Sequence, residues 1–390
     1  MKLFIKPFIP LLAILLLAGL HGNAHATSDN SCQGQVLQKT FSSGANWRFC
    51  WDIRDQEGLV LSQVYYQAPG NIQRRVLGEA ALSQIEAEFD DGAIDPVFIT
   101  TTLGLGGDRL QTRNAEDCPG GQIQNHNGRP VLCTLTRAAG YLYKYTTQRQ
   151  TEAFEISTLS SVGPRTYIQR WRFLENGTME PAIGLSGVLP AVNESPIDYG
   201  WPVTASGAIA TGLTDHYLWR LDFDLDENAA NDVIEEITST PSYNRLTKIK
   251  AINTIQTETG RSLDPETKRF WRIRDSSIRN GHGNYISYEL VPTHYDQSRA
   301  NSRDESWLSE DVYFSRYQAC ERFAADNDRT CGRNVTAFIN NNQNLNQEDV
   351  VVWYKINNHI LPRSEDSNRM AVRWSSFKLL PRDWHTQNPF

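Results

Sequence analysis

Aspartates at alternating positions form the clearest chemistry-bearing pattern in the sequence. Asp222, Asp224 and Asp226 follow one another at every second residue. Residues two apart in a strand lie on one face, so such carboxylates can share a cation. The run also begins like an EF-hand loop, but Glu227 stands where glycine is needed and Val233 where the bidentate glutamate is needed. Two interpretations stay open, a cation site with oxygen ligands and a solvated acidic strand.

Other catalytic patterns are missing from the sequence. There is no Gly-x-Ser-x-Gly elbow and no H-E-x-x-H. Gly104, Gly106 and Gly107 precede neither Lys-Ser/Thr nor a helical pattern, so they indicate a turn rather than a phosphate loop. No C-x-x-C occurs, which disfavours a zinc ribbon or a thioredoxin-like site.

The stretch from Leu159 to Leu189 predicts two strands around the turn Glu175-Asn176-Gly177, because Asn-Gly between alternating apolar runs is a strong hairpin signal. Its aromatic and basic side chains have opposite parity, with Tyr167, Trp171 and Phe173 against Arg170 and Arg172. Strand signals of this kind recur throughout the chain, and helical periodicity is clear only around Glu79 to Ala87. The sequence therefore predicts an all-β fold, one large β-sandwich with few short helices.

Residues 1–26 have the features of a secretory signal: two lysines, an apolar run and a small-residue cleavage site at Ala24-His25-Ala26. The run is too short for a membrane span, so we expect an exported protein, periplasmic or secreted, with residues 27–390 as one domain. Removal of Lys2 and Lys6 changes the formal net charge from −7 to −9. This acidic balance argues against nucleic acid and anionic membranes as partners.

Six cysteines in an exported chain indicate disulfides. Their order in the sequence suggests three local pairs, Cys32–Cys50, Cys118–Cys133 and Cys320–Cys331.

The predicted hairpin resembles the one that carries the self-processed quinone cofactor, topaquinone, in copper amine oxidases. Trp171 meets the family tryptophan, Asn176 to Glu180 meets the family D-G-T-I-E, and Tyr167 meets the second tyrosine. The tyrosine that becomes the quinone falls on Arg165. Two interpretations of Arg165 stay open: a functional cation that faces the old cavity, and a side chain that reaches solvent or pairs with an acid across the hairpin.

Two further catalytic positions can be assigned through the same resemblance. Val76 to Asp91 resembles a family helix and its tail, whose quinone-supporting tyrosine is Phe89 here. Phe98 to Gly106 resembles the segment with the general base, and Ile99 stands at that aspartate position. Neither side chain can do the family chemistry, because Phe89 has no hydroxyl and Ile99 accepts no proton.

Family spacing places the three copper ligands at Leu213, Asp215 and Ile360. His216 and His359 are each one residue out of register, and a one-residue slip turns a strand side chain to the other face. We interpret these histidines as ordinary strand residues, with displaced relics of a metal site as the alternative.

The resemblance also supports a secondary calcium-type site and the Cys118–Cys133 bridge. The calcium-type site matches five positions, which are Asp222, Phe223, Asp224, Asp349 and Val350. Carboxylates and two backbone carbonyls would supply its oxygen ligands.

The resemblance spans residues 45–389, without the small α/β domains that precede it in full-length family members. It implies a β-supersandwich and a homodimer that exchanges arm-like hairpins, for which we assign residues 238–261. Our leading hypothesis is an exported pseudoenzyme that lacks topaquinone, copper and the general base, retains calcium, and binds a small molecule or a protein in the remnant cavity. The alternative is a divergent active primary-amine oxidase that uses Thr214, His216 and His359.

Overall fold

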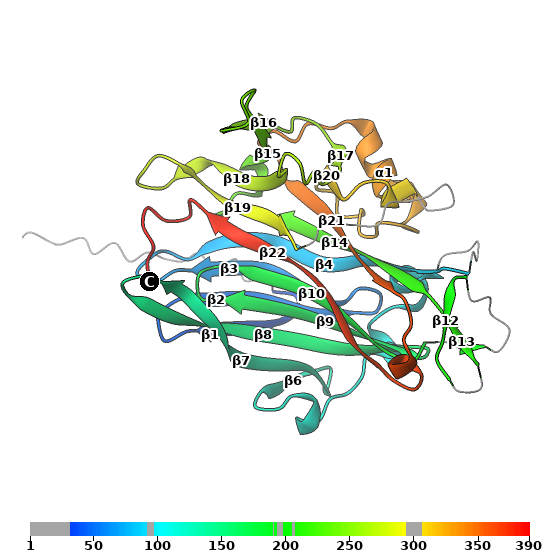
Figure 1. The fold of residues 1–390 in the computed structure, drawn as a ribbon. Coiled ribbons are helices and arrows are strands. Elements are labelled where there is room, and N and C mark those ends of the chain that lie inside the picture. The colour runs from blue at the N-terminus through cyan, green and yellow to red at the C-terminus, as the bar shows by residue number, and fades with distance from the viewer. Residues whose placement is uncertain (1–31, 92–96, 190, 193–197, 205–206, 294–305) are drawn as a thin grey trace, which may run out of the picture. The chain divides into compact units, whose positions relative to one another are not determined.

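Alternating apolar and polar residues build most of the chain into antiparallel strands, shown in Figure 1 for a computed structural model. The structure describes residues 32–91, 97–189, 191–192, 198–204, 207–293 and 306–390. Within residues 32–390, which form one unit, the described strands make two large sheets and a small third one. The predicted signal segment, 1–26, lies outside the described residues.

The first large sheet runs in the order β1-β2-β3-β4-β14-β21-β20-β17, with β5 paired to β4. Its strands are β1 (Gln35–Thr40), β2 (Asn46–Arg54), β3 (Gly58–Gln67), β4 (Arg74–Phe89), β14 (Leu213–Phe223), β21 (Val350–Ile360), β20 (Val312–Arg316), β17 (Thr259–Arg261) and β5 (Val97–Phe98).

The second large sheet runs in the order β16-β15-β18-β19-β22-β10-β9-β8-β7-β6. Its strands are β16 (Lys248–Thr254), β15 (Asp232–Pro241), β18 (Phe270–Arg279), β19 (Tyr285–Pro292), β22 (Met370–Arg382), β10 (Met179–Gly187), β9 (Arg165–Leu174), β8 (Gln148–Val162), β7 (Arg129–Lys144) and β6 (Gln122–His126). The small sheet pairs β11 (Ala191–Val192), β13 (Ile209–Thr211) and β12 (Gly200–Pro202).

Helical segments in the described residues are short. They are α1 (Val335–Phe338), one π-turn (Ile99–Leu103) and the 3₁₀ turns Gly107–Arg109, Ala115–Asp117, Ala229–Asn231, Ser306–Leu308, Arg329–Cys331, Ile339–Asn341 and Ser364–Asp366. The prediction of an all-β sandwich with few short helices is confirmed.

The main apolar core lies between the two large sheets, where Trp171 of β9 meets Trp219 of β14 edge-on at a centroid distance of 5.4 Å. A second core covers the opposite face of β14 and β21 with α1 and the turn at Ser306–Leu308. All eleven residues of β14 are consequently buried. Strand β14 can therefore hold polar side chains on either face, but only where each finds a partner.

The helical interpretation of Glu79 to Ala87, and of Val76 to Asp91, is wrong. These residues lie in the sixteen-residue strand β4, between β3 and β14. Alanine, leucine and glutamate favour helix locally, but both faces of β4 are covered, so burial outweighs propensity. Register shifts against β14 after Leu218 and Asp222 disrupt the alternation that would have indicated a strand.

The predicted hairpin is confirmed as β9 and β10. Its turn closes through Leu174 N–H donating to the Thr178 carbonyl (2.9 Å), with Gly177 at φ +89°. Tyr167, Trp171 and Phe173 are buried in the main core, while the intervening arginines lie on the outer face. The alternation therefore gave the orientation of the whole strand.

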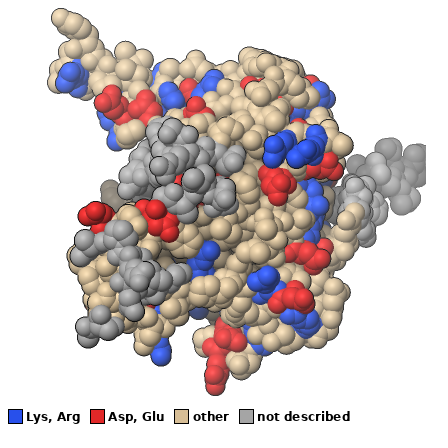
Figure 2. Space-filling view, turned by 90° about the vertical axis from the view of Figure 1, so that its right-hand side faces the viewer, with Lys and Arg blue, Asp and Glu red and all other residues tan. Residues whose placement is uncertain are grey.

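Three disulfides close local loops, Cys32–Cys50, Cys118–Cys133 and Cys320–Cys331. The segment assigned as an arm, residues 238–261, contains the end of β15 and all of β16, and β16 is exposed along nearly its whole length. Acidic and basic side chains intermingle on the face drawn in Figure 2. Across the described residues, no helix is long and apolar enough to span a membrane.

Candidate functional site

Asp215 of β14 is the centre of a polar cluster between the two large sheets. It accepts hydrogen bonds from the hydroxyls of Tyr167 (2.9 Å) and Tyr217 (3.2 Å), and from Arg165 Nη1 at 3.4 Å. The three donors to the Asp215 carboxylate come from both large sheets. Arg165 and Tyr167 lie in β9, and Tyr217 lies in β14. Asp215 and both tyrosines are fully enclosed, and 8% of Arg165 is exposed. The cluster thus joins the sheets by a buried ion pair.

Burial raises the pKa of the Asp215 carboxyl, and the Arg165 charge together with the two tyrosine hydroxyls works against that rise. Burial and the neighbouring carboxylate raise the pKa of Tyr167 and Tyr217 well above the usual value. Both phenols therefore stay protonated at neutral pH and act as donors to Asp215.

Two of the assigned catalytic positions, Arg165 and Phe89, lie at this cluster. The Arg165 guanidinium lies 5.7 Å from the Phe89 ring centroid and 5.8 Å from that of Tyr167. Phe89 is the register partner of Leu213 on β14. Ile99 is fully buried in the main core, at the start of its π-turn. Arg165 faces an acid, as one interpretation expected, but that acid belongs to the opposite sheet rather than to the hairpin.

The three positions assigned to copper ligands also come together. Leu213 and Ile360 are register partners across β14 and β21, and Asp215 lies two residues along from Leu213 on the same face. All three are buried. They offer a single oxygen donor, so these residues do not fit a site that needs three converging imidazole nitrogens.

The two displaced histidines lie on the other face of β14 and β21. His216 is buried, with Nε2 3.5 Å from Glu88 Oε2 and Nδ1 without a hydrogen-bond partner. The side chain of His359 is 56% exposed and its Nε2 lies 3.0 Å from Asp90 Oδ2. Each imidazole is therefore turned from the Arg165 cluster and placed beside a carboxylate.

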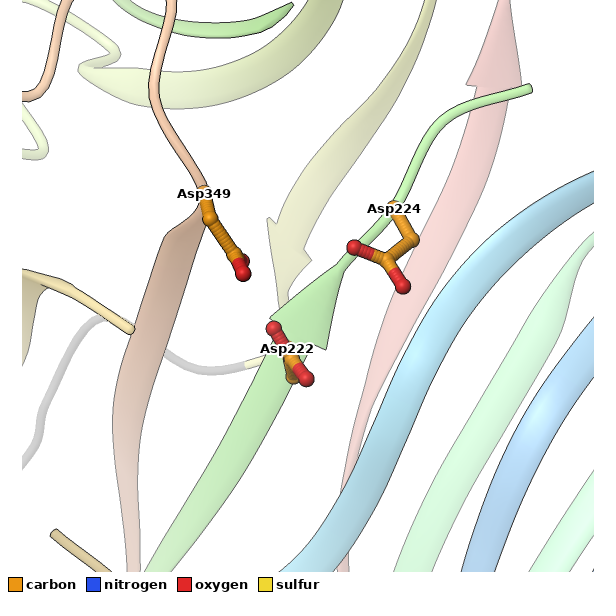
Figure 3. A group of neighbouring side chains, drawn as sticks. All are labelled: Asp222, Asp224 and Asp349. Carbon is orange, nitrogen blue, oxygen red and sulfur yellow. The ribbon is translucent and has the colours of Figure 1, made fainter. Parts of the chain in front are cut away.

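A second candidate site lies farther along β14, where three aspartates converge (Figure 3). Ligand oxygens of Asp222, Asp224 and Asp349 all lie within 4.8 Å of one another, and in the described part of the chain no other such group of three metal-binding side chains occurs. Phe223 and Val350 are register partners with buried side chains, so only their backbone carbonyls could serve a cation.

This acidic site passes two tests of fit to a hard cation. The Oδ1 atoms of Asp222, Asp224 and Asp349 are buried without hydrogen-bond partners. Gly78 of β4 leaves the room they occupy, since a Cβ there would lie 2.4 Å from Asp224 Oδ2 and 2.9 Å from Asp222 Oδ2. The site thus combines unsatisfied oxygens with a strand position where a side chain would displace the carboxylates.

Burial raises the pKa of Asp222 well above its usual range, Arg220 opposes that rise, and the neighbouring carboxylates add to it. Burial and the charge of Asp224 raise the pKa of Asp349 to about 6. Three carboxylates this close repel one another, which favours their protonated forms. A divalent cation would offset this repulsion and would bind in competition with protons.

Sequence reasoning missed two neighbours of the acidic site, Gly78 and Arg75. Arg75 Nε lies 3.4 Å from Asp224 Oδ2. A glycine inside a strand signals a close approach, which could have marked Gly78 had β4 been recognised as a strand. No sequence pattern marks Arg75 as a neighbour of the acidic site.

The surface cavities described are lined by residues outside both clusters. One of about 370 Å³ is lined by Asn176, Trp384 and the C-terminal residues to Phe390, and another of about 210 Å³ by Arg74, Arg279 and His385. Neither opens onto Arg165 or Asp215, so the prediction of a ligand in a remnant cavity stays a prediction.

Comparison with known proteins identifies the family and the fold of the chain. A family model described as "Copper amine oxidase, enzyme domain" matches residues 37–390. The chain is 26% identical over 388 residues to a primary amine oxidase of Arthrobacter sp. (strain P1), and 24% identical over 396 residues to primary amine oxidase 2 of Arabidopsis thaliana. These matches cover 88% of this chain but only 59% and 57% of the two relatives.

A solved structure, the copper-containing benzylamine oxidase of Hansenula polymorpha, superposes with a TM-score of 0.78 at 16% identity, over 90% of this chain and 61% of that one. The likeness at this identity concerns the fold. Since the family match spans nearly the whole described chain, this protein belongs to the copper amine oxidase family and corresponds to its enzyme domain.

Proposed function

We propose that this chain is a copper amine oxidase domain that no longer oxidises amines and acts by binding a partner. The contact between Arg165 and Asp215 is the observation that supports this proposal. A guanidinium stands at the position assigned to the quinone precursor, and its carboxylate partner stands at a copper-ligand position. Arginine has no phenol to oxidise, and one carboxylate does not replace three imidazoles.

The surrounding residues support the same proposal. Ile99 cannot take up the proton that a general base removes, and such proton transfer usually contributes about 10²–10⁴-fold to a rate. Phe89 keeps an aromatic ring against Arg165 but has no hydroxyl to donate. Ile99 and Phe89 thus provide packing and do not provide groups that transfer protons.

Three measurements on the purified mature protein test the proposal. After incubation with Cu²⁺ under air, hydrogen peroxide release from a panel of primary amines, redox staining for quinone, and copper content per chain are determined. We expect no peroxide above buffer, no staining and no stoichiometric copper. The primary amine oxidase of Arthrobacter serves as the positive control. One copper per chain together with quinone staining would overturn the proposal.

A divergent active primary-amine oxidase is the second candidate. Its relatives are described as primary amine oxidases, and Tyr167 provides a phenol beside Asp215. Tyr167 would have to become the cofactor, with Thr214, His216 and His359 as ligands. Amine-dependent peroxide release that is lost in Tyr167→Phe would favour this candidate, because the substitution removes only the hydroxyl.

The acidic site supports a structural calcium as part of the proposal. Asp222, Asp224 and Asp349 would hold the ion with the backbone carbonyls of Phe223 and Val350. Calcium bound only to the folded state raises stability by mass action, about 2.7 kcal/mol at a hundredfold excess over Kd. A rise in melting temperature on adding calcium to chelator-treated protein tests this assignment.

We include a second copy of the chain among the proposed partners, so that the protein forms a homodimer. Exposed apolar side chains on the β15–β16 hairpin, such as Tyr243, Leu246 and Ile249, leave apolar area uncovered in one chain. Light scattering during size-exclusion chromatography of the exported, mature protein should give the mass of a dimer. A monomer at micromolar concentration would rule out the proposed dimer.

A further inference from the structure

Arg75 places a positive charge against the acidic site. This residue of β4 directs Nε to within 3.4 Å of Asp224 Oδ2, and its side chain is 12% exposed. Its other nitrogens donate to the Glu227 carbonyl at 3.0 Å and to Gln63 Oε1 at 3.3 Å. The Nε atom itself is buried without a hydrogen-bond partner. Arg75 therefore interacts with Asp224 through charge, without an aligned bond that would fix it there.

The other nearby arginines make their hydrogen bonds and ion pairs with other groups. Arg220 lies on the same face of β14 as Asp222, and its charge opposes the rise in the pKa of Asp222. Its Nε donates to the Glu321 carbonyl (3.0 Å) and its Nη1 contacts Glu79 Oε1 (3.3 Å). Arg74, next to Arg75 on β4, pairs with Asp226, which is not one of the three aspartates. Arg75 forms the ion pair with Asp224 of the acidic site.

We propose that Arg75 and a divalent cation compete for the carboxylate of Asp224. This inference rests on the cation site of the proposed function and adds its regulation. Without the cation, Arg75 offsets part of the repulsion among the three aspartates, so the strands keep their arrangement. With the cation, the Arg75 charge opposes binding. The site is thereby tuned to exchange calcium with its surroundings rather than to hold it permanently.

Gly78 and Arg75 both lie on β4 and are both next to the same oxygen, Oδ2 of Asp224. The position of Gly78 lets Asp224 Oδ2 approach β4, and Arg75 lies beside that oxygen. The oxygen that faces Arg75, Oδ2, belongs to the same carboxylate as the unpartnered Oδ1. A cation held by Asp224 and the Arg75 charge would therefore act on one carboxylate.

Calcium titration of chelator-treated, full mature protein tests this competition, by calorimetry and by the calcium-induced shift of the melting temperature. The variants are Arg75→Met, which keeps an unbranched apolar stem, Arg75→Lys, which keeps the charge, and Arg74→Met as the matched control on the neighbouring residue. We expect Arg75→Met to bind calcium about tenfold more tightly and to show a lower melting temperature without calcium. Arg75→Lys and Arg74→Met should stay within about twofold of the unmodified protein.

The outcomes distinguish failure of the Arg75 proposal from failure of the calcium site. Equal affinity in Arg75→Met and Arg74→Met would overturn the role of Arg75 and leave the calcium site standing. No calcium binding by any of the four proteins would remove the calcium site and this inference together. If Arg75→Met does not fold without calcium, Arg75→Gln takes its place, and an affinity no tighter than that of the unmodified protein would refute the competition.

Discussion

Leu213 and Ile360 lie directly opposite each other in the ladder between β14 and β21. These positions were assigned as copper ligands from two separate motifs, and the ladder brings them together beside Asp215. A shift of one residue in either strand would have turned His216 or His359 inward. The same ladder pairs Thr214 with His359 on the other face. The two candidate ligand sets therefore differ in which face meets Arg165, and only the set with Asp215 contacts it.

Breaking the ion pair between Arg165 and Asp215 is expected to cost more than removing both partners. Asp215→Ala leaves a buried guanidinium and two tyrosine hydroxyls without their acceptor, so we expect a loss of about 3–5 kcal/mol in unfolding free energy. The double variant Arg165→Met/Asp215→Leu removes both charges and should recover most of that loss. Denaturant unfolding of the single and double variants measures the coupling. Additive losses would contradict a direct pair.

Replacing the histidines should leave metal content unchanged. His359→Ala removes an exposed partner of Asp90 and should change stability by no more than about 0.5 kcal/mol. His216→Ala empties a buried position and should cost about 1–3 kcal/mol. Elemental analysis of the copper-treated proteins provides the decisive comparison. A stoichiometric copper signal that disappears in both variants would instead support the divergent oxidase.

Filling the position of Gly78 should abolish the response to calcium. The Cβ of Gly78→Ala would meet Asp224 Oδ2 at 2.4 Å, so the carboxylates must move apart or the strand must shift. We expect the calcium-induced rise in melting temperature to vanish, as it should in Asp349→Asn, which removes a ligand charge instead of space. A variant that kept the full calcium response would show that the ion binds elsewhere.

The strands that alternate in polarity were predictable, and those covered on both faces were not. The β9–β10 hairpin carries a turn sequence and a clear parity, so its buried and exposed faces follow from sequence. Strand β4 lacks that parity because residues on both of its faces are buried along much of its length, and its alanines and glutamates favoured a helix. Only the three-dimensional pairing shows that both faces are covered.

The candidate sites divide in a similar way. Asp222 and Asp224 were visible as a pair two residues apart, and the resemblance supplied Asp349. The partnership of Arg165 with Asp215 joins different sheets, so no local spacing indicates it. Arg75 likewise reaches Asp224 across a strand pair, and its position depends on the register of β4 against β14.

Glu321 should make the protein less stable as the pH rises toward neutrality. Burial, with a contribution from Glu258, raises the pKa of Glu321 from 4.5 to about 7, and Arg220 opposes that rise. Between these two values the folded state holds a proton that the unfolded state has released. The free energy of unfolding therefore falls as the pH rises from about 4.5 through about 7, and then levels off.

Glu321→Gln removes this titration while keeping the shape of the side chain. We expect the variant and the unmodified protein to be similarly stable near pH 4.5, and the variant to be more stable by roughly 1–3 kcal/mol at pH 8. Melting temperatures in chelator at both pH values measure the difference, with the exposed Glu266→Gln as control. If the difference between variant and parent were the same at both pH values, Glu321 would not titrate in this range, because only a proton held by the folded state makes the effect of the substitution depend on pH.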